Sequence, residues 1–161
     1  MRRLASLLLG LLFIAAAHAG PAEDNADLCF KDDGDAAVEA CTRAIQSGRF
    51  KGPVLATMFN NRAIEYRQSR DYDRAIADYS QAIRLDADFP GAYAGRGLAY
   101  EGKSDIPKAK ADYQKALTAP EKYDDGQWAH DVARTRLSAL GDKPNLSDKP
   151  DKPKLNDKPK R

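Results

Sequence analysis

The stretches FNNRAIEY at residues 59–66 and YAGRGLAY at residues 93–100 decide the fold, because one pattern recurs in them 34 residues apart. Aromatic residues match aromatic ones, small residues match small ones, and the polar positions between them vary. A fixed period of this length is the signature of a repeat protein, in which each unit is one supersecondary structure. The same offset continues downstream, where it pairs Ala75 with Ala109, Asp78 with Asp112, Tyr79 with Tyr113 and Ala82 with Ala116.

Apolar residues within each unit recur at intervals of three and four, which is the spacing of one face of an α-helix. A polar turn separates two such helices in each unit, at residues 69–71 and at residues 102–105. Asp71 and Asp105 can each accept a backbone N–H as a helix N-cap, and Pro107 falls in the first turn of the helix that follows, where its missing N–H does no harm. The sequence therefore predicts two helix–turn–helix hairpins.

This pattern resembles the tetratricopeptide repeat family, whose first helix carries a large residue, Gly or Ala, and Tyr, and whose second helix carries Ala, an aromatic residue and Ala. The matching residues are Phe59, Ala63, Tyr66, Ala75, Tyr79 and Ala82 in one unit and Tyr93, Gly97, Tyr100, Ala109, Tyr113 and Ala116 in the next. The small residues let paired helices approach, and the aromatic rings fill the space between hairpins. The resemblance implies an all-α fold, an α-solenoid of helix–turn–helix hairpins.

Arg62 and Arg96 depart from the family pattern, which usually has Leu at this place. An aspartate on the second helix recurs with each arginine, at Asp78 and Asp112. This register favours one Arg–Asp pair per hairpin. The alternative is that both arginines face the groove and bind an acidic or carboxylate group.

A degenerate hairpin is expected upstream, so that three hairpins occupy residues 22–118. Its first helix would be short, from about residue 23 to residue 30, and Asp35 would cap its second helix. Residues 47–53 are interpreted as a loop that leads to the next unit. The second-helix positions of this hairpin fall at Ala37, Cys41 and Ala44.

Cys29 and Cys41 are the two cysteines of the chain, and we expect a disulfide between them if the chain is exported to an oxidising space. It would tie together the two helices of the end hairpin, which has no neighbour on one side. A zinc site is the weaker alternative, because the chain has no second cysteine pair and no histidine near either thiol. Two buried free thiols are a further alternative, and no metal site is predicted.

A capping helix is expected at residues 124–140, after the last hairpin. Gln127 follows Asp124 by three residues, as in a capping box, and Gly141 ends the helix. It resembles the solvating helix that closes tetratricopeptide arrays, and we assign it to covering the last hairpin. Its apolar stripe consists of Trp128, Ala129, Val132, Ala133, Leu137 and Leu140.

The two ends of the chain differ from the repeat region. Residues 1–19 combine a short basic start, an apolar run and a small-residue site at Ala19, which is the layout of a cleaved signal peptide. The run is short for a membrane-spanning helix, so no stable membrane insertion is expected and an uncleaved anchor is the less favoured alternative. We therefore expect an exported protein, in a Gram-negative periplasm.

Residues 141–161 repeat the motif Asp-Lys-Pro, and so many prolines exclude a packed core, so we expect a disordered tail. Residues 142–161 carry 7 Lys and Arg against 4 Asp, whereas residues 20–140 carry 17 basic residues against 20 acidic ones. The tail is interpreted as a solubilising extension. The alternative is a weak electrostatic contact with the envelope, which would make the protein an envelope-associated structural protein.

The sequence offers little for catalysis. His130 is the one histidine outside the expected signal peptide, and no motif pairs it with a nucleophile. We therefore expect neither an enzyme nor a cofactor, and the net charge of +2 over the whole chain gives no reason to expect a nucleic-acid partner.

By family resemblance, the protein is a scaffold or adaptor that binds a protein or peptide in a concave groove lined by the first helices. Asn61 matches one place of the family's carboxylate clamp, but the lysines of that clamp are missing, so recognition of chaperone tails is not inferred. Carried over by position, the groove residues are Thr57, Asn60, Asn61, Ile64, Arg67, Gln68, Gly91, Ala94, Leu98 and Glu101.

Overall fold

The computed structural model describes residues 22–120 and 123–141 of the chain. The expected signal peptide and residues 142–161 of the expected tail lie outside this part. The described residues form seven α-helices and no β-strand. The all-α fold class is therefore confirmed. The helices are α1 (Ala22–Lys31), α2 (Gly34–Gln46), α3 (Gly52–Gln68), α4 (Tyr72–Leu85), α5 (Pro90–Gly102), α6 (Ile106–Thr118) and α7 (Gly126–Ala139).

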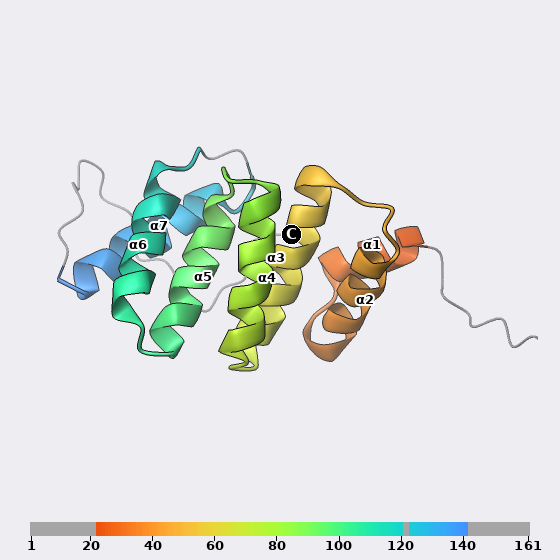
Figure 1. Cartoon of the computed structure of the whole chain (residues 1–161), viewed down its shortest axis with the longest axis horizontal. Helices are drawn as coiled ribbons and strands as arrows, with labels where there is room; N and C mark the ends of the chain where they lie inside the picture. The colour runs from red at the N-terminus through yellow and green to blue at the C-terminus, as the bar shows by residue number, and fades with distance from the viewer. Residues whose placement is uncertain (1–21, 121–122, 142–161) are drawn as a thin grey trace, which may run out of the picture.

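The helices are arranged as three antiparallel hairpins, α1–α2, α3–α4 and α5–α6, stacked side by side, with α7 packed against α5 and α6 (Figure 1). The odd-numbered helices contact one another along the stack, from α1 to α3 to α5 to α7. The even-numbered helices of the described chain touch the odd-numbered ones but not each other. The stack therefore curves toward the odd-numbered helices, which we call the inner layer; α2, α4 and α6 form the outer layer.

Identical turns close the second and third hairpins. The Asp71 carboxylate accepts the backbone N–H of Arg74 at 3.2 Å, and the Asp105 carboxylate accepts that of Lys108 at 3.3 Å, so both predicted N-caps are confirmed. Arg70 and Ser104, each one residue before the N-cap, take the left-handed conformation with φ of 63° and 62°.

Three predicted helix starts are wrong by one or two residues. Helix α2 begins at Gly34 after Asp33, so Asp35 lies in the first turn and is not the N-cap. Helix α7 begins at Gly126 after Asp125, and no side-chain cap forms there, so the expected capping box from Asp124 is absent. Helix α3 already begins at Gly52, because Pro53 suits a first turn.

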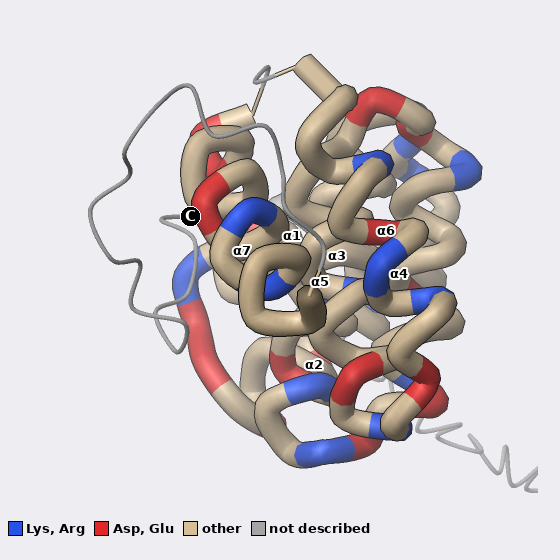
Figure 2. The backbone as a smooth tube through the Cα atoms, turned by 90° about the vertical axis from the view of Figure 1, so that its left-hand side faces the viewer, with Lys and Arg blue, Asp and Glu red and all other residues tan. Residues whose placement is uncertain are grey.

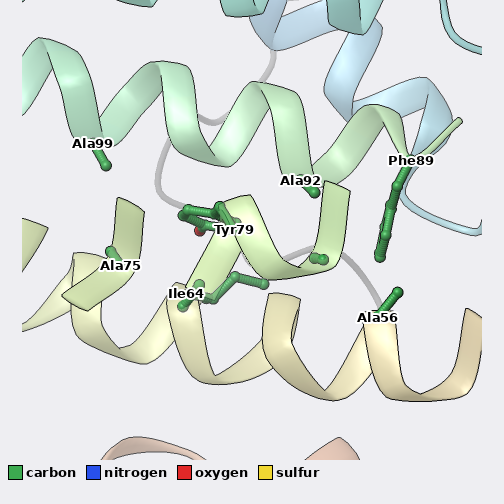
Figure 3. Packing of buried hydrophobic residues seen from close by; sticks show 9 residues of the cluster. Ala56, Ile64, Ala75, Tyr79, Phe89, Ala92 and Ala99 are labelled. Carbon is green, nitrogen blue, oxygen red and sulfur yellow. The ribbon is translucent and has the colours of Figure 1, made fainter. Parts of the chain in front are cut away.

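The core depends on close approach of helices at glycine. A Cβ atom on Gly95 would lie 2.4 Å from Cζ of Tyr79, and one on Gly97 would lie 2.6 Å from Cε1 of Tyr113. Both tyrosine rings are fully buried and fill the space between hairpins, as the repeat pattern predicts. Figure 3 shows Tyr79 between α5 and the helix that carries Ile64.

The first hairpin contains the disulfide between Cys29 and Cys41, with the Cα atoms 4.5 Å apart. It joins α1 to α2 within a small cluster to which α3 contributes Met58. The bond therefore secures the hairpin that, within residues 22–120 and 123–141, packs against one neighbouring hairpin. No helix in the described residues is both long enough and apolar enough to cross a membrane.

Candidate functional site

Arg62 and Arg96 are each paired with an aspartate of their own hairpin. The Arg62 guanidinium donates to both carboxylate oxygens of Asp78, at 2.7 and 2.9 Å, and Arg96 donates to both oxygens of Asp112, at 2.8 Å each. Both ion pairs are bidentate and largely buried. They are the Arg–Asp pairs that the repeated aspartates of the sequence predict. The alternative, in which the arginines bind a ligand, is therefore not supported.

Helix α3 contributes the first set of expected groove residues, and several of them are already engaged by other parts of the protein. Asn61 donates to the carbonyl oxygen of Cys29 at 3.3 Å, so this side chain holds α1 against α3. Thr57 donates to the carbonyl oxygen of Pro53 within its own helix. Ile64 is buried in the core cluster that includes Tyr79, and is not a surface contact.

Asn60, Arg67 and Gln68 remain as the other polar residues of the expected set on α3, and of these Arg67 lies beside the Tyr79 hydroxyl of α4. Asn60 is 3% exposed, and its Oδ1 atom is buried with no hydrogen-bond partner. Arg67 is half-buried and Gln68 is exposed, both at the last turn of the helix.

Helix α5 contributes the second set, and α7 together with the residues before it covers most of this set. Ala94 is buried in the cluster that α7 completes, and Leu98 packs against that cluster. Glu101 is held by the guanidinium of Arg136 and by the hydroxyl of Tyr113, which donates at 2.5 Å. Burial alone would raise the pKa of Glu101, but the hydrogen bonds from these two residues hold it below its ordinary value.

Asp125 closes the N-terminal end of α5. Its carboxylate lies so close to Gly91 that a Cβ atom there would be 1.7 Å from Oδ2. Asp125 is 6% exposed and its Oδ1 atom has no hydrogen-bond partner. Burial raises the pKa of Asp125 to about 6, with a smaller contribution from the charge of Asp124. Asp125 therefore covers Gly91, one of the expected groove residues.

Buried polar atoms without a hydrogen-bond partner gather along the inner layer. Such atoms are costly, at about 1–3 kcal/mol each, and they mark places where water or a ligand completes the structure. The Tyr79 hydroxyl is one of them, and it reaches the Gly95 backbone of α5 from the outer-layer helix α4. Burial raises its pKa, although the nearby Arg67 guanidinium opposes this. The other such atoms among the described residues are Asn60 Oδ1, Arg67 Nε, Asp125 Oδ1 and Trp128 Nε1.

Hollows on the described surface include two that border residues of α3 to α6. One, of about 580 Å³, lies between α4, α5 and α6, and the Arg96–Asp112 pair forms part of its wall. The other, of about 270 Å³, is lined by Arg67, Gln68, Arg70 and Tyr72 at the turn between α3 and α4. Figure 2 shows basic and acidic residues interspersed along the helices, and in this view the described residues form no face of a single charge. Whether a charged side chain can bind a ligand therefore depends on whether a neighbour of opposite charge already pairs with it.

Sequence reasoning missed Arg70, Tyr72 and Asp125 as possible site residues. Arg70 and Tyr72 could have been found by extending the 34-residue alignment into the turn, where they align with Ser104 and Ile106. Asp125 gives no such signal, since its position depends on how α7 packs. Within the described ranges no cluster of His, Cys, Asp and Glu could hold a metal ion, and His130 donates to the carbonyl oxygen of Ala119 at 3.0 Å.

Comparisons with known proteins agree with the repeat geometry. A family model described as "TPR repeat" matches residues 64–104, and one described as "Tetratricopeptide repeat" matches residues 90–123. Small glutamine-rich tetratricopeptide repeat-containing protein 2 of Mycosarcoma maydis is 35% identical over 104 residues, which is 65% of this chain and 28% of that protein. RNA polymerase II-associated protein 3 of Xenopus tropicalis is 35% identical over 83 residues, which is 52% of this chain and 12% of that protein.

Among solved structures, the second TPR domain of human RPAP3, determined in complex with the HSP70 peptide SGPTIEEVD, superposes with a TM-score of 0.58 and 28% identity. The match covers 76% of this chain and 93% of that domain. The chain spans less than a third of the length of the two curated relatives described above.

Proposed function

Because the chain is a tetratricopeptide-repeat protein, we propose that it is an adaptor whose inner layer binds an extended segment of a partner protein. The observation that carries the proposal is Asn60 on the inner layer, which is 3% exposed. Its Oδ1 atom has no donor among the described residues and can reach a ligand by rotation of the amide. A peptide backbone N–H is a donor of the kind this atom lacks.

The dimensions of α3 suit such a ligand. A helix of 17 residues is about 25 Å long, the length of about seven residues of extended peptide. The binding surface is the half of the inner layer that α7 leaves free, between Asn60 and the end of α3. Support comes from the similar human domain, which was solved with a bound peptide.

The cellular setting of the proposal is the periplasm of a Gram-negative cell. It rests on the signal-peptide layout of residues 1–19 and on the Cys29–Cys41 disulfide, because disulfides persist in oxidising compartments. Cell fractionation after expression in such a cell tests it. A protein recovered from the cytoplasm with residues 1–19 still attached would contradict this part.

The binding proposal is tested by Asn60→Ala. The change removes an acceptor that has no internal partner, so the unfolding temperature is expected to stay at or above that of the wild type. Capture of a specific protein from cross-linked envelope extracts is expected to fall.

Gln81→Ala is the matched control, because Gln81 is exposed on α4 of the outer layer in the same hairpin. It is expected to capture the same protein as the wild type. Equal capture by Asn60→Ala, or an equal loss in both variants, would contradict binding along the inner layer.

A further inference from the structure

The hollow of about 270 Å³ at the α3–α4 turn contains two guanidinium groups. Arg67 and Gln68 belong to the last turn of α3, Arg70 to the turn itself and Tyr72 to the start of α4. The Tyr72 ring lies against the backbone of Gly102, where a Cβ atom would be 2.4 Å from Cζ. The hollow therefore borders the C-terminal end of α5, at one end of the inner layer.

The acidic side chains around this hollow already have other cationic partners. Asp71 pairs with Arg74 and Asp73 with Lys103, while Glu101 pairs with Arg136. Among the described residues, neither Arg67 nor Arg70 forms an ion pair, and the buried Nε of Arg67 has no hydrogen-bond partner. Two guanidiniums thus share a small space, and within the described residues neither of them forms an ion pair with an acid.

The backbone at Arg70 adds an independent observation. Arg70 takes φ of 63°, a left-handed conformation that favours glycine and costs a side chain with a Cβ atom about 1 kcal/mol. Its counterpart in the next hairpin, Ser104, has φ of 62° and the same turn hydrogen bonds. The fold therefore does not need arginine at this position.

We propose that this hollow binds the side-chain carboxylate of an Asp or Glu residue in the partner segment, and so anchors one end of that segment on the inner layer. Guanidinium groups match the planar geometry of a carboxylate and can bind it through two parallel hydrogen bonds. The amide of Gln68 and the hydroxyl of Tyr72 can donate to the same group. The proposal rests on the proposed function, whose ligand it specifies.

A structural role for the two arginines makes a different prediction. Cations near the end of a helix interact favourably with its last carbonyl groups, and Arg67 lies in the last turn of α3. If this were the whole role, removing the Arg70 guanidinium would lower stability and leave binding unchanged. If Arg70 serves a ligand, glycine at this position keeps or raises stability, because it relieves the left-handed backbone, and weakens binding.

The test is selection of peptides from a random library displayed on phage, against the purified protein and two variants, Arg70→Gly and Ser104→Gly. Both variants place glycine at the same point of the same turn, and only the first removes a guanidinium. Peptides selected by the wild type and by Ser104→Gly are expected to be rich in Asp and Glu. Peptides selected by Arg70→Gly are not.

The strongest selected peptide is then synthesised with a C-terminal amide, both as selected and with its acidic residue replaced by the matching amide residue. By fluorescence anisotropy, we expect the acidic peptide to bind Arg70→Gly about tenfold more weakly than the wild type. The neutral analogue is expected to bind the wild type about tenfold more weakly than the acidic peptide does. Its affinity for Arg70→Gly is expected to equal its affinity for the wild type.

The outcomes separate the two proposals. Failure to select any peptide counts against the proposed function. Selected peptides without acidic residues, or acidic peptides that bind Arg70→Gly and Ser104→Gly equally, overturn the carboxylate site alone. Dependence on a free C-terminus, seen as lost binding of the amidated peptide, also overturns it, because the anchor would then be a terminal carboxylate.

Discussion

At the scale of single residues, Asp125 is a carboxyl group whose ionisation the fold opposes. It is 6% exposed, its Oδ1 atom has no partner, and burial raises its pKa from 3.8 to about 6. A carboxyl group whose pKa is raised on folding binds its proton more tightly in the native state than in the unfolded state. Its contribution to stability is therefore most favourable below about pH 4 and is lost as the pH rises through about 6.

Asp125→Asn is expected to remove this loss. Near pH 4 the variant should have about the same free energy of unfolding as the wild type, whereas at pH 8 it should be more stable by about 1–3 kcal/mol. Urea unfolding at several pH values measures both proteins, and the difference between them cancels the titration of other groups. A difference that does not change between pH 4 and pH 8 would contradict the assignment.

At the scale of elements, the position of α5 depends on glycines that face rings of the neighbouring outer-layer helices. Gly95 has the Tyr79 ring of α4 on one side, and a Cβ atom would lie 2.4 Å from it. The ring is fully buried and cannot move away without opening a space elsewhere. The close approach of α4 and α5 is thus a direct consequence of one missing methyl group.

Gly95→Ala is expected to destabilise the protein by about 1–3 kcal/mol, because overpacking outweighs the better helix propensity of alanine. Thermal or urea unfolding measures the loss. Tyr79→Leu removes the ring that the methyl group meets, so Gly95→Ala should cost less in that background. The same cost with and without the ring would show that the contact is not the cause.

The same elements show how far the sequence could predict the structure. The hairpins were predictable, because Tyr79 and Tyr113 repeat with small residues at a fixed spacing and because Asp71 and Asp105 cap helices through local contacts. The covering of Gly91 was not, since it requires α7 to place Asp125 there by tertiary packing.

The expected groove was only partly predictable for a related reason. A repeat register places residues on one face of a helix, but it does not say what packs on that face. Asn61 faces α1, so its amide holds two helices together. Glu101 faces α7, and Arg136 holds its carboxylate. The Oδ1 atom of Asn60 has no donor among the described residues, so this acceptor is left for a ligand.

At the scale of the whole molecule, each hairpin depends on its neighbours only, as expected for a solenoid. The stability of one end is therefore partly independent of the stability of the other. In the described part of the chain the first hairpin contacts one other hairpin, and it carries the disulfide, which closes a loop with a sequence separation of 12 residues. Such a small loop corresponds to about 2–3 kcal/mol in the chain-entropy description.

Reduction of the Cys29–Cys41 bond is expected to act locally. Amide hydrogen exchange in α1 and α2 should become faster by about 30-fold or more, in line with that free energy, while exchange in α5 and α6 stays the same. Exchange measured by mass spectrometry with and without a reductant tests this. The helices α5 and α6 provide the internal control, and equal acceleration along the whole chain would show instead that the hairpins unfold together.

Arg62 and Arg96 also link each hairpin to the one before it. Besides its aspartate, Arg62 donates to the Thr42 hydroxyl on the preceding hairpin at 2.9 Å, and Arg96 donates to the Ser80 hydroxyl at 2.9 Å. Each hydroxyl in turn donates to a carbonyl oxygen of its own helix at 2.7 Å. Rotation of one hairpin against the next would break these bonds, so they oppose such rotation. Under the proposed function, the surface that binds the partner segment is therefore formed before the segment arrives.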